Sequence, residues 1–282
     1  MPERITPAQR MWWTFKRNKT ALVGAVGVCI IFVLAAVGPF FMPYDPVEQH
    51  LMDQLKPPSR QYLFGTDVFG RDVLSRVVLG ARFSLMVGLS SVMIAVVLGV
   101  PLGIIAGYKG GTIDTVITRV VDILMSFPVL ILGLMIRAAI GGGLTGLVLA
   151  IGISITPRFI RLARGPTISI REKEYVEAAK AMGVNEFRLM FRHILPNVIS
   201  DVAVMSTLWI ALAIRLEANL SFIGIGIPPP TPSWGEMIRS GVDFLVNAPW
   251  ISFIPGMFIL FTVMSFNMIG DGIRDIIDPR LD

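Results

Sequence analysis

Few residues of this chain have the types and spacing that catalysis or metal binding requires. His50 and His193 lie far apart without neighbouring ligands, and Cys29 is the only cysteine, so the chain can form neither a disulfide nor a cysteine-based metal site. The stretch GGGLTG at 141–146 lacks the lysine and hydroxyl pair of a phosphate-binding loop. A serine nucleophile elbow and an HExxH sequence are also absent. The sequence therefore predicts a protein that is not an enzyme and binds no metal or cofactor itself.

Charged residues also lie inside long apolar stretches, where they can bind a solute or form ion pairs. A charge at the centre of a membrane costs about 2.5 to 3.5 kcal/mol on insertion scales, so each needs a partner or a purpose. Counting outward along their segments places Arg137 and Arg215 in the outer part of the bilayer. They can face a translocation path and attract a substrate carboxylate, reach the outer interface, or pair with Glu217. Arg119 and Asp122, three residues apart, are predicted to form a structural ion pair.

The composition is that of a membrane protein with several spans. Hydrophobic residues make up 54% of the chain and charged residues 16%, and the mean hydropathy is +0.69, outside the range of ordinary soluble domains. A helix needs roughly 20 apolar residues to cross a membrane. The first apolar run exceeds the roughly 7 to 15 residues of a cleaved signal peptide, so it is an uncleaved span. We expect an all-α membrane protein with six transmembrane helices, at about 21–42, 83–107, 116–139, 144–163, 198–222 and 250–269.

The placement of lysine and arginine orients these helices. Six crossings put both termini on one side, and 17 of the 25 basic residues fall on that side, which is therefore predicted to be cytoplasmic. They lie in the two tails and in the 108–119 and 158–197 segments. The net charge of +5 thus reflects membrane topology and not binding to nucleic acid. We expect a cytoplasmic tail at 1–20 and a single membrane domain at 21–282, with external loops at 43–82 and 224–249 and a cytoplasmic loop at 164–197.

A polar segment at 175–197 interrupts the apolar runs on the predicted cytoplasmic side. It carries two stripes with the helical spacing i, i+3, i+4 and i+7, namely Tyr175, Ala178, Ala179 and Met182, followed by Phe187, Met190, Phe191 and Ile194. Gly183 can end the first helix, Asn185 can cap the second, and Pro196 cannot continue it. The pattern predicts a helix, a bend and a second helix. Such a segment either docks on a partner or lies on the lipid headgroups.

The two predicted external loops contain further ordered segments. In the first loop, Thr66 or Asp67 can cap a helix with its apolar side at Leu74, Val77, Val78 and Ala81, which would run along the outer interface before turning into the second span. This helix has either a structural role or direct contact with substrate. In the second loop, a stiff proline-rich piece precedes Trp234, which we expect at interfacial depth.

Parts of the polar segment resemble the EAA loop of the integral-membrane subunits of bacterial ABC importers. The matching residues are Glu177, Ala178, Ala179, Gly183, Ile194, Leu195 and Pro196, while His193 stands where that family often has isoleucine. In that family the loop contains a coupling helix that inserts into a cleft on a cytoplasmic ATPase subunit. The resemblance implies that Glu177 orients this helix by hydrogen bonding or pairing near its base, and that Gly183 permits the bend. The coupling surface would then comprise Ala178, Ala179 and Met182, with Phe187, Leu195 and Pro196 completing the site.

A wider resemblance covers the chain from roughly residue 10 to the end. FGTD, GRDVLSR, LSFIGIG, PPPTPSWG and GDGIRDIIDPRL, with Arg119, Asp122, Pro128, Arg158 and Arg161, resemble the C-type permease of dipeptide, oligopeptide and nickel importers. This resemblance implies a type I ABC importer permease fold in the bacterial inner membrane. It also implies a second permease subunit, two cytoplasmic ATPase subunits that hold ATP and Mg²⁺, and an external binding protein. Arg137 and Arg215 depart from the apolar or small residues expected there.

Alternatives remain open at the level of the sequence. The leading hypothesis is a permease subunit for a peptide-like solute, and the same class of importer can carry nickel complexes, glutathione-like solutes or oligosaccharides. A carrier that works without an ATPase would need broken helices or intramembrane carboxylates, and the sequence offers neither clearly. A membrane scaffold that binds an ATPase without transporting anything is the third reading.

Overall fold

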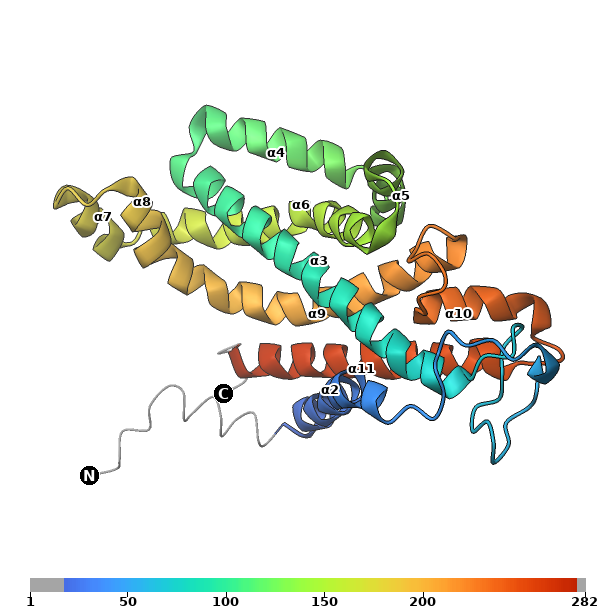
Figure 1. Ribbon diagram of the computed structural model, residues 1–282. Coiled ribbons are helices and arrows are strands. Elements are labelled where there is room, and N and C mark those ends of the chain that lie inside the picture. Colours follow the sequence, from blue (N-terminus) through green and yellow to red (C-terminus); the bar gives the residue numbers. More distant parts are fainter. Residues whose placement is uncertain (1–17, 278–282) are drawn as a thin grey trace, which may run out of the picture. The chain divides into compact units, whose positions relative to one another are not determined.

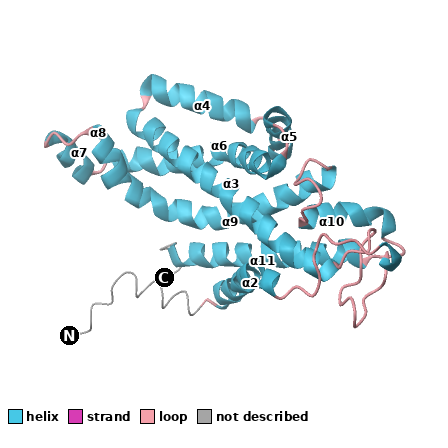
Figure 2. Cartoon of the chain, in the orientation of Figure 1, coloured by secondary structure: helices cyan, strands magenta, loops and turns pink. Residues whose placement is uncertain are grey.

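The computed structural model describes residues 18–277, and within this range the chain is built from helices, with one isolated β-bridge between Thr66 and Asp72 (Figure 2). The predicted all-α architecture is confirmed. Most of the predicted cytoplasmic tail, including Arg4, Arg10, Lys16 and Arg17, lies outside the described residues, as does Arg280.

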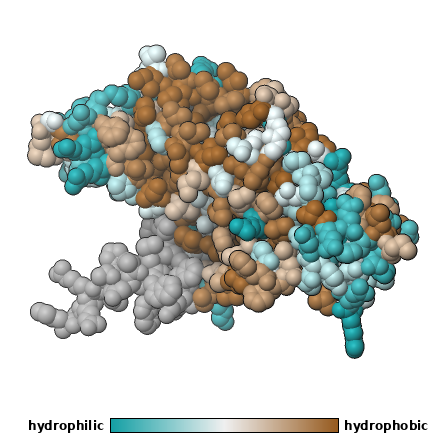
Figure 3. Space-filling model, viewed as in Figure 1, coloured by the Kyte–Doolittle hydropathy of each residue, from teal (hydrophilic) through white to brown (hydrophobic). Residues whose placement is uncertain are grey.

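Five of the described helices are long and apolar enough to cross a membrane, and a bent pair makes a sixth if it counts as one span. The five are α2 (Lys19–Val37), α3 (Val73–Lys109), α6 (Gly143–Arg171), α9 (Leu195–Ile223) and α11 (Trp250–Ile277) (Figure 1). The last four each contain a predicted apolar run, whereas α2 ends at Val37, before the end of the run predicted at 21–42. Apolar residues dominate the visible surface of the helices, while hydrophilic residues gather over the hairpin of α7 (Glu174–Ala181) and α8 (Glu186–Arg188) and over the loops beside α10 (Trp234–Gly241) (Figure 3).

The third predicted span is not a single straight helix. It is divided into α4 (Gly111–Met125) and α5 (Val129–Ile140), whose axes differ in direction by 97°. Pro128 has φ −53° and ψ 132° at the break, and a proline also disfavours the helical conformation of the residue before it. The run predicted at 116–139 is therefore one span only if this bent pair is counted as one, and hydropathy did not reveal the bend because it is continuous across the break.

The loop before the second span ends earlier than predicted, and the helix predicted around 74–81 is present as the first part of α3, continuous with that span. Residues from Val73 onward belong to α3, and its first turn is capped by Asp72, whose Oδ2 accepts hydrogen bonds from the Ser75 backbone N–H at 2.8 Å and hydroxyl at 2.7 Å. The predicted cap at Thr66 or Asp67 is wrong. Both residues instead stabilise the loop, where Asp67 accepts a hydrogen bond from Arg71 Nε at 2.6 Å.

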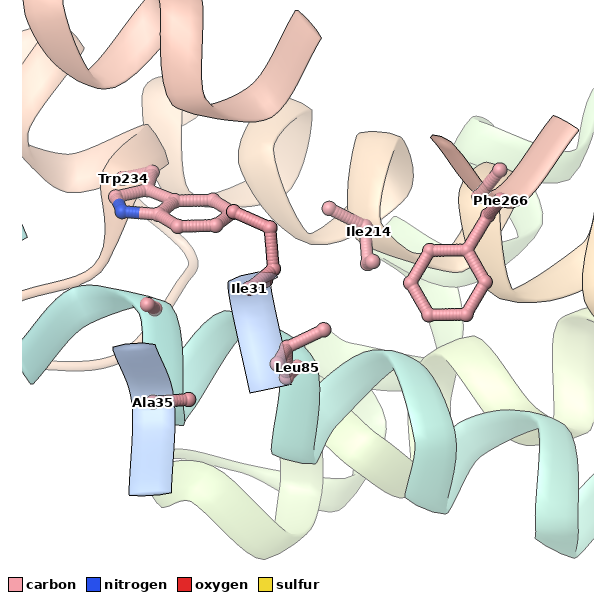
Figure 4. Close-up of a cluster of buried hydrophobic side chains, with 8 residues drawn as sticks. Ile31, Ala35, Leu85, Ile214, Trp234 and Phe266 are labelled. Carbon is pink, nitrogen blue, oxygen red and sulfur yellow. The ribbon is translucent and has the colours of Figure 1, made fainter. Parts of the chain in front are cut away.

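One compact unit consists of residues 18–88 and 207–277 of the described chain. In this unit α2 packs along α11 through small residues, since a Cβ atom on Gly27 would lie only 2.2 Å from Ser265 Oγ. An apolar cluster joins α2, α3, α9, α10 and α11 and includes Ile31, Ala35, Leu85, Ile214, Trp234 and Phe266, with Trp234 and Phe266 at opposite ends of the view (Figure 4). Trp234 is fully buried, and its indole N–H donates to the Val77 carbonyl at 3.0 Å. Trp234 therefore packs against its own chain, and its expected interfacial depth stays a prediction.

Buried charges fasten α10 and the loop before α3 to α3 itself. Arg76 is 1% exposed, and its guanidinium contacts Glu236 Oε2 at 3.0 Å, the Pro46 carbonyl at 3.0 Å and Asp67 Oδ2 at 3.5 Å. These groups come from the loop before α3, from α3 and from α10. Buried charges that are paired and hydrogen-bonded in this way fix the relative positions of the elements that carry them.

A second polar contact orders the middle of the loop between α2 and α3. Tyr62 donates a hydrogen bond to Asp53 Oδ2 at 2.6 Å, and Lys56 pairs with the same carboxylate. The hydrogen bonds from Lys56 and Tyr62 hold the pKa of Asp53 below its usual range. The hydrogen bond to Asp53, together with burial, raises the pKa of Tyr62 to about 12. Both groups therefore keep their ordinary charge states around neutral pH, and the contact persists there.

The second compact unit comprises residues 89–206. Here the C-terminal half of α3 lies directly against α6, along Gly99, Gly103 and Gly107. A Cβ atom on Gly103 would lie 2.4 Å from the Ile160 carbonyl oxygen, and one on Gly107 would lie 2.8 Å from that of Arg164. Glycines spaced four residues apart allow two membrane helices to approach this closely. This contact places the C-terminal end of α6, and the hairpin that follows it, beside the C-terminal end of α3.

Substitution of Gly103 tests this close approach. Gly103→Ala should destabilise the protein by about 1 to 3 kcal/mol, because the added methyl group must displace backbone atoms of α6. Gly165→Ala is the matched control in α6, where a Cβ atom meets nothing within 4 Å; it should be neutral or slightly stabilising. Thermal unfolding in detergent measures both effects, and equal melting temperatures for the two variants would contradict this account.

Candidate coupling site

The polar hairpin begins with a short helix that ends as the sequence predicts. After α6 ends at Arg171, α7 (Glu174–Ala181) follows, and Gly183 adopts φ +79°. The Val184 N–H donates to the Ala179 carbonyl at 3.1 Å, and the Gly183 N–H donates to the Lys180 carbonyl at 3.0 Å. This pair of bonds is a Schellman motif, which satisfies the last carbonyls of a helix and requires a left-handed residue. The role predicted for Gly183 in the bend is confirmed.

The second half of the hairpin is capped as predicted but does not end as predicted. Asn185 Oδ1 accepts a hydrogen bond from the Phe187 N–H at 2.9 Å and caps α8 (Glu186–Arg188). A π-helical turn, η3 (Leu189–Ile194), then runs directly into α9. Pro196 lies in the first turn of α9 and does not terminate the helix, so that prediction was wrong. The Leu195 N–H donates to the Met190 carbonyl five residues back, which is the wide spacing of a π-helix. The chain then continues into α9 through Pro196, whose ring would crowd a tighter turn.

The exposed surface of the hairpin differs from the predicted stripes. Met182 is 77% exposed and Phe187 67% exposed, and Tyr175 and Ala178 are also exposed. Ala179 is only 4% exposed, so it packs against its own chain and cannot lie on a docking surface as expected. In the second half, Leu195 is partly exposed and Pro196 is exposed. The centroids of the Phe187 and Phe191 rings lie 4.5 Å apart, and this ring contact helps to hold the exposed Phe187 side chain in place.

The face of α7 that packs against the rest of the chain was not predicted from the sequence. Val176 is buried together with Ala179 on one face of α7, and the elements nearest to α7 are η3 and α6. The sequence carries the signal for this face, because Val176 and Ala179 are three residues apart and both are apolar. The choice between this stripe and the one through Ala178 depends on packing that the local pattern does not specify.

Glu177 lines an open polar pocket of about 410 Å³ beside α7. The other lining residues come from the ends of α3 and α6 and from the hairpin, and are Tyr108, Lys109, Arg171, Glu172, Val176, Lys180 and Glu186. The expected bond of Glu177 near the base of the hairpin is not formed within the described residues, since its side chain is exposed on the pocket side of α7. Other contacts close the base. Lys109 pairs with Glu186, and Arg171 Nη1 donates to the Gly107 carbonyl at 3.1 Å.

Ion pairs connect α4 to α6 near the hairpin. Arg164 donates to both oxygens of Asp114, at 2.5 and 2.6 Å, and Arg161 pairs with Asp122 at 2.8 Å. The predicted pair between Arg119 and Asp122 is therefore wrong. Because α4 packs on α6, Asp122 is within reach of an arginine on α6, while Arg119 is exposed on α4. A spacing of three residues permits a pair within one helix but does not exclude a partner from another helix.

The charged residues predicted near a substrate path have different surroundings. Arg137 is buried near the end of α5, and its guanidinium donates to the Gly141 carbonyl at 2.5 Å. Arg215 is exposed on α9. Glu217 is fully buried and accepts hydrogen bonds from Ser84 at 3.1 Å and Ser221 at 2.7 Å, so the predicted alternative of pairing with an arginine is not realised among the described residues.

Two features that the sequence was expected to lack are present. The break between α4 and α5 interrupts a candidate span, and Glu217 is a buried carboxylate within another span. A broken span and a buried carboxylate are thus compatible with an ATPase-independent carrier as well as with an ATPase-driven permease. The choice between a carrier and an ATPase-driven permease depends on the hairpin and on comparison with known proteins.

The fold resembles that of solved transporter subunits. It matches a chain of the structure titled "Inward facing conformations of the MetNI methionine ABC transporter: CY5 SeMet soak crystal form" with a TM-score of 0.58 and 20% identity, covering 72% of this chain and 97% of that chain. A second crystal form of the same transporter matches equally well, with a TM-score of 0.58. These matches show that the chain has the type I ABC importer permease fold.

Residues 99–282 match the family described as "Binding-protein-dependent transport system inner membrane component", and residues 6–58 match the "N-terminal TM domain of oligopeptide transport permease C". The chain belongs to the binding-protein-dependent transport system inner membrane component family. It is a transport component, and membership of this family implies that it works with an ATPase and a substrate-binding protein.

Curated relatives align over nearly the whole chain. The dipeptide transport system permease protein DppC of Alkalihalophilus pseudofirmus is 40% identical, with 98% of this chain and 91% of that protein covered. DppC of Haemophilus influenzae is 39% identical over 98% and 96% of the two chains. The glutathione transport system permease protein GsiD of Pectobacterium atrosepticum is 37% identical over 98% and 92%.

Substitutions of Gly183 test the conformation of the bend. Gly183→Ala places a Cβ atom at a left-handed residue, which costs about 1 to 2 kcal/mol, whereas asparagine tolerates this conformation better. We expect amide exchange at the end of α7 to accelerate about tenfold in Gly183→Ala and much less in Gly183→Asn. Hydrogen exchange followed by mass spectrometry of the 176–186 region measures this. If the two variants exchanged at the same rate, the end of α7 would not depend on the left-handed conformation of residue 183.

Proposed function

We propose that this chain is the C-type permease subunit of an ABC importer that moves a peptide-like solute from an external binding protein into the cytoplasm. It pairs with a second permease subunit and is driven by two cytoplasmic ATPase subunits that bind ATP and Mg²⁺. Both termini and the hairpin lie on the cytoplasmic side of the inner membrane. The excess of basic residues in these segments supports this orientation.

The exposed apolar surface of the hairpin carries the proposal. Met182 and Phe187 project from a segment that is otherwise polar, and the bend at Gly183 separates them along the chain. Isolated large apolar side chains within a polar rim are the usual anchors of a protein interface, because they fill pockets on the partner. The surrounding lysine, arginine and glutamate residues keep this surface in water and out of the lipid core. A cleft on an ATPase subunit is the partner that this surface fits.

The arrangement of the hairpin also explains how motion can reach the membrane. Leu189, Met190 and Ile194 of η3 are buried, and η3 continues into α9 without a loop. The salt bridge between Lys109 and Glu186 and the hydrogen bond from Arg171 tie the base of the hairpin to the end of α3. A displacement of the exposed tip by closing ATPase subunits is therefore delivered to helices and is not absorbed by a flexible connection.

Peptides are the proposed cargo because relatives that align along nearly the whole chain are named as dipeptide permeases. The glutathione permease among the relatives supports a wider class of small solutes with peptide bonds. Ligand analysis of the binding protein that co-purifies with the complex tests the cargo. Recovery of a nickel complex or an oligosaccharide, and no peptide, would replace this part of the proposal.

The docking surface is tested with Met182→Asp and Phe187→Asp. Each change places a charge in a contact that is proposed to be apolar, which should lower the yield of co-purified ATPase subunits about tenfold or more. The matched control is Val246→Asp, the same kind of change at a 95% exposed residue outside the hairpin, which should leave the yield unchanged. Full recovery of ATPase subunits with both hairpin variants would overturn the proposed role of this surface.

Arg137 and Arg215 are tested as attractors of anionic solutes. If they act on the translocation path, Arg137→Met and Arg215→Met should lower uptake of the acidic dipeptide Ala-Glu more than that of neutral Ala-Leu, by about tenfold for a lost ion pair. Uptake into proteoliposomes with the binding protein and ATP provides the measurement. An equal loss for both dipeptides assigns the arginines a structural role, which for Arg137 would be its contact with the Gly141 carbonyl.

A further inference from the structure

A buried cluster of polar side chains lies between three elements on the external side of the first compact unit. Glu217 of α9 accepts hydrogen bonds from Ser84 of α3 at 3.1 Å and from Ser221 of α9 at 2.7 Å. The Ser221 hydroxyl in turn lies 3.4 Å from that of Ser233, which precedes α10 and caps it by accepting from the Glu236 N–H. All four side chains are buried. The cluster thus connects α3, α9 and the start of α10.

Glu217 is held by hydroxyl groups and not by a countercharge. Among the described residues it takes part in no salt bridge, and Arg76 on α3 is already paired with Glu236 of α10. The other charged residues near it in sequence or on the same elements, Arg82, Arg215 and Arg239, are exposed. A buried polar group without a charged partner is tolerated where hydrogen bonds satisfy it, and then those bonds set its position.

The backbone around the cluster leaves no space for independent movement of α10. A Cβ atom on Gly235 would lie 2.5 Å from the Ala218 carbonyl oxygen and 2.8 Å from Ser221 Cβ. A Cβ atom on Gly226 would lie 1.9 Å from the Ser221 hydroxyl. The first turn of α10 therefore rests directly on the turn of α9 that carries the cluster.

Two further contacts attach α10 to α3. The buried Trp234 donates to the Val77 carbonyl at 3.0 Å, and Glu236 pairs with the buried Arg76 at 3.0 Å. Together with the path from Ser84 through Glu217 to Ser233, three polar connections join the first turn of α10 to α3. Of these three, only the path through Glu217 also includes α9.

We propose that Glu217 is a positioning residue that fixes the external segment 224–249 to α9, so that both move as one body. Because α9 continues from Leu195 to Ile223 and begins directly after η3 of the coupling hairpin, this attachment links an external segment to the ATPase-coupling element through one helix. The inference rests on the proposed function for its consequence, which is that a binding protein on the external side alters ATPase activity through α9. The attachment itself does not depend on the cargo.

Variants at three positions separate hydrogen bonding from charge and from general damage. Ser84→Ala and Ser221→Ala each remove one donor to Glu217. Glu217→Gln keeps the shape, and its amide can accept from one serine and donate to the other, because a hydroxyl serves as donor and acceptor. Glu217→Ala removes all these bonds. Ser206→Ala is the matched control, since the Ser206 hydroxyl bonds only to the Val202 carbonyl in its own helix.

Hydrogen exchange of the assembled complex in nanodiscs tests the attachment. We expect amide exchange in α10 to accelerate about tenfold in Ser84→Ala, Ser221→Ala and Glu217→Ala, with α7 unchanged, because a buried acceptor or donor has lost its partner. Glu217→Gln and Ser206→Ala should match the unmodified protein. Unchanged exchange in both serine variants, or equal acceleration in Glu217→Gln and Glu217→Ala, would overturn the proposal. The serine variants keep the test valid if Glu217→Ala fails to assemble.

ATPase activity tests the consequence. In Ser84→Ala and Ser221→Ala, basal ATP hydrolysis should stay within about twofold, while stimulation by the binding protein with Ala-Leu should fall at least fivefold, an effect of the size of one lost buried hydrogen bond. Retained stimulation despite faster exchange in α10 would overturn the link through α9. If the unmodified complex neither imports Ala-Leu nor responds to the binding protein, the proposed function fails instead, and the exchange data still decide the attachment.

Discussion

Close approach of backbones is the interaction on which the rest of this structure depends. Lipid is as apolar as the side chains of the helices, so burial of apolar surface between helices contributes little in a membrane. Contact between helices therefore relies on small residues and on polar groups. Gly99, Gly103 and Gly107 let α3 reach the backbone of α6, and Gly27 lets α2 reach α11. Within its own unit each contact positions a polar segment, because the coupling hairpin follows α6 and α10 precedes α11 along the chain.

Polar contacts then fix the segments that leave the apolar surroundings. On α4 and α6 the pairs of Asp114 with Arg164 and of Asp122 with Arg161 join neighbouring helices near the hairpin. In the external loops, Arg76 gathers groups from three parts of the chain. The exposed pairs contribute little free energy each, whereas the buried network sets a specific geometry at the cost of desolvation. Such contacts are suited to holding parts in a defined relation while larger bodies move.

The sequence predicted the features that depend on local chemistry and failed where tertiary contacts decide. Apolar runs located the spans, and Gly183 and Asn185 ended and began helices as expected, because these effects arise within one turn. Hydropathy could not reveal the break at Pro128, although the proline itself was a usable signal. The partner of Asp122 and the buried position of Ala179 depend on helices distant in sequence, so spacing within one helix gave the wrong answer for both.

The π-helical turn shows how one local irregularity serves the whole element. A proline in the first turn of a helix is tolerated, because the backbone N–H that it lacks would have no partner there. Pro196, however, directly follows the helical residues of η3, so its ring crowds the preceding turn. Widening that turn to bonds five residues apart leaves η3 continuous with α9. The buried Leu189 and Ile194 then hold η3 in place on both sides of the widened turn. A loop at this point would satisfy the proline equally well, but it would separate the exposed coupling surface from the helix that crosses the membrane.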